Sequence, residues 1–200
     1  MPPGPRIVIA ALLTVLLSVL VAGCSSSHKN GLATVGFAGA ALPSGIAAPA
    51  LTLTDQDGHG VSLAAYRGRV VVLSFLYSTC GGPCILIAHQ IRGALDELVR
   101  PVPVLLISSD PAADSPAAVR RFLRAVSLTG RASYLSGTAK QLRAAWRAYP
   151  ALSHGAGQRA ARRFVGVMLI DRHGAERVAY SAEQLTPESL AHDIRKLAGG

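Results

Sequence analysis

Two cysteines, Cys80 and Cys84, follow an apolar run and stand four residues apart in the stretch LYSTCGGPC (76–84). Paired sulfurs at such a spacing can form a redox couple, a metal clamp or a structural disulfide. A structural disulfide between them would close a loop of a few residues, and so short a loop removes little entropy from the unfolded chain. The pair therefore favours chemistry, either thiol–disulfide exchange or metal binding.

The flanking sequence predicts that the cysteines stand where a strand is followed by a helix. Residues 70–75 (VVVLSF) are a β-branched, apolar run typical of a strand buried on both faces. Apolar residues then recur at helical spacing from Ile87 to Leu98. A helix N-terminus favours the thiolate, the form of cysteine that reacts and binds metals. Thiolates select soft ions, above all Cu(I), although Zn(II) also accepts them, and a metal held by two sulfurs invites a third ligand.

The rest of the chain alternates strand and helix patterns. We expect a β-hairpin from residues 51–54 and 61–63, further strands at 70–75, 102–108 and 164–171, and a hairpin partner at 177–180. Helical spacing of apolar residues appears at 87–98, 119–126, 142–149 and 190–197. This order predicts an α/β domain with a central sheet.

Composition and charge limit the function classes. The chain has 200 residues, half of them apolar, which is ample for one domain with a core and short for two. Its formal net charge of +9 comes largely from scattered arginines, with no basic cluster interleaved with aromatic residues. We interpret these residues as a solvated face, and we expect no nucleic-acid partner.

The N-terminal residues are predicted to be a targeting segment. Arg6 precedes an apolar run at 7–22, which suits a signal-peptide core and is shorter than the about 20 residues that cross a bilayer. The run ends in Val-Ala-Gly-Cys at 21–24, which resembles the lipobox of bacterial lipoproteins. We therefore expect a signal peptide at 1–23, lipidation at Cys24, a tether at 24–36 and a domain at 37–200. The protein would be lipid-anchored at the extracytoplasmic face of the cell membrane, an oxidising compartment for Cys80 and Cys84.

Several segments together resemble the Sco/SenC family. They are LTLTDQDG (51–58), YRGRVVVLSF (66–75), LYSTCGGPC (76–84), QIRGALDEL (90–98), LISSDP (106–111) with DSP (114–116), and LID (169–171). They cover most of residues 37–197. The resemblance implies a thioredoxin-like fold, with a central mixed β-sheet flanked by helices and an N-terminal β-hairpin. It also implies a copper chaperone for cytochrome c oxidase assembly.

The family pattern implies copper held by Cys80, Cys84 and one histidine shortly before the strand at 165–171. This sequence has Arg163 at that position, and arginine stays protonated and offers no lone pair to a metal. His154, nine residues upstream, is interpreted as a solvated loop residue, although a ligand role stays open. We expect no ligand among the other histidines, His28, His59, His89, His173 and His192. The proline that usually follows the second cysteine is replaced by Ile85.

Two functions follow from this reading. The first is a metallochaperone that binds Cu(I) through the Cys80–Cys84 dithiol and delivers it to a copper-site subunit of cytochrome c oxidase, or to another copper or thiol protein. The alternative is a thiol–disulfide oxidoreductase that acts on cysteines of a respiratory or copper-site partner, with weak or no copper binding. In that case Arg163 would stabilise a nearby thiolate.

Other readings are less favoured. No proline lies between Pro49 and Cys80, which argues against a peroxiredoxin, and none lies between Pro150 and Pro187, which argues against an ordinary thioredoxin. A paralogue without either activity is disfavoured by the intact cysteine pair. Asp110, after the second central strand, is either a group that tunes the site or a plain turn residue.

Overall fold

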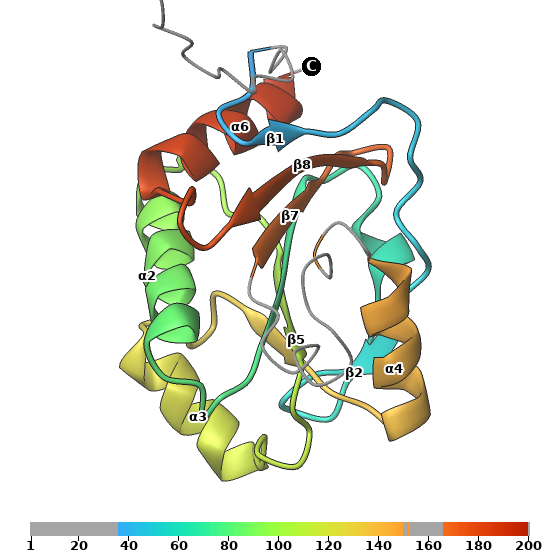
Figure 1. The fold of residues 1–200 in the computed structure, drawn as a ribbon, viewed down its shortest axis with the longest axis vertical. Helices are drawn as coiled ribbons and strands as arrows, with labels where there is room; N and C mark the ends of the chain where they lie inside the picture. Colours follow the sequence, from blue (N-terminus) through green and yellow to red (C-terminus); the bar gives the residue numbers. More distant parts are fainter. Residues whose placement is uncertain (1–35, 150–151, 153–165, 200) are drawn as a thin grey trace, which may run out of the picture. The chain divides into compact units, whose positions relative to one another are not determined.

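A six-stranded mixed sheet forms the centre of the computed structural model, which describes residues 36–149, 152 and 166–199 (Figure 1). The strand order is β1-β8-β7-β4-β5-β6. Three strands are parallel, β4 (Val71–Leu76), β5 (Val104–Ser108) and β6 (Ser133–Leu135). The other three pair antiparallel, β7 (Gly166–Ile170), β8 (Glu176–Ser181) and β1 (Ala40–Ala41). A separate hairpin joins β2 (Thr52–Thr54) to β3 (Gly60–Ser62).

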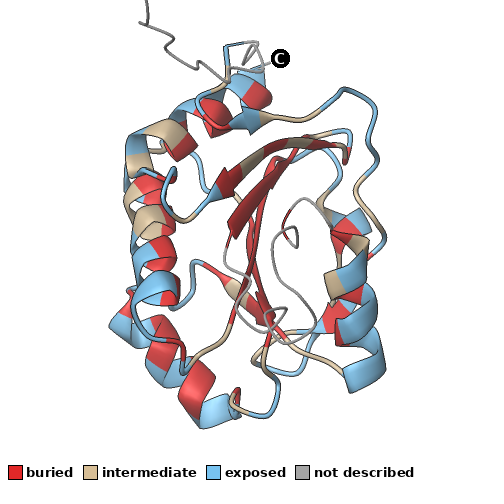
Figure 2. Cartoon of the chain, viewed as in Figure 1, coloured by how far each residue is buried: buried red, intermediate tan, exposed pale blue. Residues whose placement is uncertain are grey.

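Helices cover both faces of the sheet, so its strands are buried on both sides (Figures 1 and 2). One face packs against α2 (Gly82–Asp96), α3 (Pro116–Ala125) and α6 (Pro187–Gly199). The other packs against α4 (Ala139–Ala148), the 3₁₀ helix η1 (Leu63–Tyr66) and the hairpin. Each face of the sheet has its own hydrophobic core. Alternate residues of β4 point to the two faces, so Val72 packs in the first core and Leu73 in the second. This explains the nearly continuous apolar run of β4, because a strand covered on both faces has no solvent-facing polar side.

The expected α/β fold is confirmed, including the central mixed sheet with flanking helices and the N-terminal hairpin. Two short strands were not expected. The edge strand β1 is a pair of alanines, and β6 is only three residues long. The strand expected to begin at residue 102 begins at Val104, after Pro103, and proline cannot donate to a sheet ladder. Leu63, expected in a strand, begins η1.

A buried carboxylate on α6 fixes the start of the described chain. Asp193, with no exposed surface, accepts the backbone N–H groups of Ala38 (2.8 Å) and Gly39 (3.0 Å). Gly39 must be glycine, because a Cβ atom there would lie 2.6 Å from side chains of β8. Phe37 lies under two cations, with Lys196 Nζ 5.4 Å and Arg177 Cζ 5.7 Å from its ring centre. The chain therefore enters the domain beside the C-terminal part of α6.

Several predictions concern other parts of the chain. The signal peptide at 1–23, Cys24, nearly all of the tether, His154 and Arg163 lie outside the described residues. The domain boundaries and the lipid anchor therefore stay predictions. Within the described ranges, no helix combines the length and the apolar character needed to cross a bilayer.

Candidate functional site

Cys80 and Cys84 are joined by a disulfide at the N-terminus of α2, with their Cα atoms 5.7 Å apart. The two sulfur-bearing residues differ in access. Cys84 has no exposed surface, whereas Cys80 keeps 8 % of its surface exposed. Both residues are buried, and Cys80 is the more accessible of the two.

The local sequence explains this turn from strand to helix. After β4, the Cys80 N–H donates to the carbonyl of Tyr77 (3.0 Å) and closes a tight turn. Gly81 caps α2, and Pro83 fits the first helical turn because its missing N–H would have no partner there. A Cβ atom on Gly81 or Gly82 would meet nothing within 4 Å, so the backbone beside the disulfide faces open space. The pair lies at the carboxyl edge of the parallel strands, where α/β proteins gather functional groups.

Asp114 lies at the same edge and ties three segments together. Its carboxylate accepts the Ser78 N–H (2.6 Å), the Ser108 hydroxyl (2.5 Å) and the Tyr134 hydroxyl (2.6 Å). Burial, together with the negative charge of Asp114, raises the pKa of Tyr134, so this phenol stays protonated and donates. Sequence reasoning did not assign Asp114 a role. The signals were its place in the DSP segment (114–116) that resembles the family and its position before the Ser115-Pro116 start of α3.

Further polar groups surround the turn. Trp146 on α4 donates its indole N–H to the Ser108 carbonyl (3.0 Å), and the Ser109 N–H donates to the Leu76 carbonyl (2.9 Å). The buried hydroxyls of Ser78 and Ser109 have no hydrogen-bond partner in the part of the chain that the structure describes. An unpaired buried hydroxyl costs about 1–3 kcal/mol, and such costs are commonly tolerated at functional sites.

Two large apolar side chains are exposed beside the disulfide. Ile85 and Leu86, on the first turn of α2, expose 41 % and 46 % of their surface. The other exposed large apolar residues within the described ranges are Ile46 and Val99. The start of α2 therefore presents apolar side chains to solvent next to Cys84 in the sequence.

The described residues fit only part of a Cu(I) site. When reduced, Cys80 and Cys84 supply two soft sulfur donors from one turn. Within residues 36–149, 152 and 166–199 no group of three His, Cys, Asp or Glu residues could hold a metal ion. The four histidines in these ranges, His59, His89, His173 and His192, are exposed. A third donor would have to come from residues outside these ranges or from a partner.

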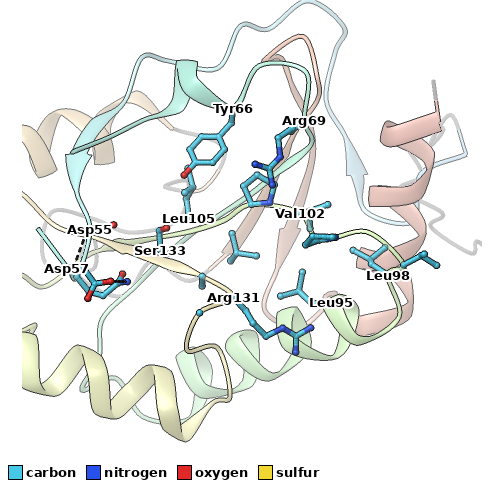
Figure 3. Close-up of a pocket in the computed structure, with 17 residues that line it drawn as sticks. Asp55, Asp57, Tyr66, Arg69, Leu95, Leu98, Val102, Leu105, Arg131 and Ser133 are labelled. Atoms are coloured by element: carbon cyan, nitrogen blue, oxygen red, sulfur yellow. Dashed lines mark hydrogen bonds between the residues drawn. The ribbon is translucent and has the colours of Figure 1, made fainter. Parts of the chain in front are cut away.

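A cavity of about 610 Å³ lies away from this chemistry (Figure 3). Its walls include Leu95 near the C-terminal end of α2 and Leu98 just after this helix, with Tyr66, Arg69 and Arg131 around them. The length of α2 separates it from Cys84, about 20 Å at 1.5 Å per residue. The cavity is therefore not the site of sulfur chemistry.

Comparison with known proteins identifies the family of the chain. The SCO1/SenC family model matches residues 43–199. The chain is 34 % identical over 108 residues to a Mycobacterium tuberculosis (strain CDC 1551 / Oshkosh) protein named "Putative peroxiredoxin MT2597". That match covers 54 % of this chain and 66 % of the relative, so the chain spans less than two thirds of the relative's length.

Solved structures share the fold. A SCO1/SenC family lipoprotein from Bacillus anthracis str. Ames superposes with a TM-score of 0.63 at 20 % identity, covering 78 % of this chain and 97 % of that one. Bradyrhizobium japonicum ScoI, solved with copper bound, has a TM-score of 0.56 at 23 % identity, covering 76 % and 99 %. With the family model matching most of the domain, the chain belongs to the SCO1/SenC family.

Proposed function

We propose that this protein is a lipid-anchored, extracytoplasmic thiol–disulfide oxidoreductase of the SCO1/SenC family. Its partner is a copper-site or other respiratory protein whose cysteines must be kept reduced. One observation carries the proposal: Cys80 and Cys84 are bonded to each other, and Cys80 keeps 8 % of its surface exposed while Cys84 has none. The described residues therefore supply what disulfide exchange needs, whereas a metal site needs a further donor.

The exchange proceeds in two steps that start from the reduced pair. The Cys80 thiolate attacks one sulfur of the partner's disulfide, forming a mixed disulfide, and the partner's other sulfur leaves as a thiolate that takes up a proton. Cys84, deprotonated, then attacks the Cys80 sulfur and releases the partner's second thiol. Two electrons and two protons pass to the partner, and the protein is left with the Cys80–Cys84 disulfide. An extracytoplasmic dithiol reductant returns the pair to its reduced state.

The decisive experiment traps the mixed disulfide. The full chain carrying Cys84→Ser is reduced and mixed with a soluble oxidase copper-site domain whose cysteine pair has been oxidised. We expect a stable covalent complex, because the resolving sulfur is absent and Cys80 keeps 8 % of its surface exposed. The matched variant Cys80→Ser should form no complex, since Cys84 is fully buried. Equal trapping by both variants, or by neither, would overturn the proposal.

A second candidate, delivery of Cu(I), is favoured by the position of both sulfurs on one turn, with their Cα atoms 5.7 Å apart. It is supported by family membership and by the copper-bound B. japonicum relative. On this proposal Cys80 and Cys84 hold the ion, and a residue outside the described ranges or the oxidase partner completes the site. The replacement of the family histidine by Arg163 weakens binding.

A Cu(I) titration against competing chelators tests this second function. We expect the reduced chain to take up one ion, and we expect Cys80→Ser and Cys84→Ser each to abolish uptake. Arg163→His should raise the affinity strongly by restoring an imidazole donor. Failure of the reduced wild-type chain to compete even with weak chelators would count against copper.

A further inference from the structure

The carboxylate of Asp114 links the turn that carries Cys80 to two neighbouring strands. It accepts a bond from the Ser78 backbone in the turn after β4, from the Ser108 hydroxyl on β5 and from the Tyr134 hydroxyl on β6. Asp114 itself is 9 % exposed, so these bonds form in a nearly water-free environment. Bonds to a buried charge are stronger than neutral ones.

The bond to Ser78 acts on the turn that holds the first sulfur. Ser78 lies two residues before Cys80, inside the turn closed by the Cys80 N–H and the Tyr77 carbonyl. The Ser78 hydroxyl has no hydrogen-bond partner in the described part of the chain, and the Ser78 N–H donates to Asp114. Loss of the carboxylate would release the Ser78 N–H and let the turn change shape.

We propose that Asp114 is a positioning residue that favours closure of the Cys80–Cys84 disulfide by holding the turn at residues 77–80. This inference rests on the proposed redox function of the pair. Two sulfurs held in bonding geometry close more readily, because less conformational freedom is lost when the bond forms. Asp114 acts through its bond to Ser78 and not by contact with either sulfur.

The readout is the equilibrium constant of disulfide formation against reduced and oxidised glutathione, measured on the full chain. For Asp114→Ala we expect a fall of about tenfold, the equivalent of one charge-assisted hydrogen bond. For Asp114→Asn we expect a fall of about threefold, because the amide oxygen still accepts the Ser78 N–H, in a weaker neutral bond. This graded rescue separates positioning from a general loss of stability.

The matched control is Asp171→Ala. Asp171 is also buried, and it also accepts backbone N–H groups, those of His173 and Ala175 in the β7–β8 turn. We expect Asp171→Ala to destabilise the fold and to leave the glutathione equilibrium within about twofold of wild type. Thermal unfolding of each variant establishes the loss of stability separately.

Three results would overturn the inference. Asp114→Ala could keep the wild-type equilibrium, or shift it no more than Asp171→Ala does. If Asp114→Ala does not fold, an unchanged equilibrium in folded Asp114→Asn decides against it. The proposed function fails in a different way, because a wild-type chain that traps no partner can still show the equilibrium shift in its variants.

Discussion

Reduction of the Cys80–Cys84 disulfide is expected to weaken the fold only slightly. The bonded residues are separated by four positions, and the loop-entropy relation gives a contribution of about 2 kcal/mol for so short a loop. Small proteins unfold with a free energy of about 5–15 kcal/mol, so the reduced chain stays folded. Cys84 remains in the core as a small apolar side chain, since it is fully buried.

Urea denaturation of the full chain, with and without a thiol reductant, measures this difference. The single tryptophan, Trp146, reports unfolding, because its indole N–H is bonded to the Ser108 carbonyl in the folded state. We expect one cooperative transition in each state, with a lower midpoint in the reduced state. A chain with both cysteines changed to serine is the control, and the reductant should not alter its transition.

The loss of unfolding free energy on reduction decides whether the disulfide is one that cycles in a redox reaction or a structural one. If reduction unfolded the chain, or removed more than about 4 kcal/mol, the disulfide would contribute more than its loop length allows. The pair would then be a structural staple. A protein that must pass through its reduced state could not use it, and the redox proposal would be refuted.

Three further predictions concern single side chains. Under reducing conditions Cys84→Ser should cost about 1–3 kcal/mol more than Cys80→Ser in urea denaturation, because it places a hydroxyl at a fully buried position. Burial tends to raise the pKa of Asp171, but hydrogen bonds from Ala175, Arg177 and His173 outweigh it and lower the pKa below 3.8. The stabilisation by Asp171 should therefore be complete well above pH 3.8 and be lost as the pH falls through the lower folded pKa, a dependence that pH-resolved unfolding should find reduced in Asp171→Asn. Burial raises the pKa of Glu176, so Glu176→Gln should raise the thermal midpoint at pH 7, by the equivalent of about 1 kcal/mol or less.

Each of these has a clear contrary outcome. Equal losses in Cys80→Ser and Cys84→Ser would contradict the buried position of Cys84. An unchanged acid dependence in Asp171→Asn would mean that the turn bonds do not hold its charge. A lower midpoint in Glu176→Gln would show that the carboxylate has a stabilising partner at neutral pH.

Much of the fold could be predicted from local patterns. The β4 run and the helical stripe after Cys84 are long, strongly apolar and bounded by glycine and proline, so strand and helix were both recognisable. Strand β6 was not, because three residues with one polar side chain carry no periodic signal and their pairing with β5 is set by the fold. The same holds for the two alanines of β1.

The cysteine pair was recognisable from spacing, whereas its surroundings were not. Ser78, Ser108 and Tyr134, which bond to Asp114, stand 36, 6 and 20 positions from it in the chain. They meet because parallel strands bring their carboxyl ends to one edge. Sequence reasoning singled out Asp110 at this edge, although the carboxylate that bonds to the cysteine turn is that of Asp114. Serine and tyrosine hydroxyls are common enough that no spacing rule would have selected them.

The attachment of Phe37 beside the end of α6 sets how the domain is presented to other molecules. Phe37 contacts Arg177, which is paired with Asp171 next to β7, and the last residue of β7 lies opposite the first residue of β4. Cys80 follows the far end of β4, about 20 Å away along the strand. The described chain therefore enters the domain at the edge opposite Cys80, which keeps this point of attachment away from the approach to the reactive sulfur.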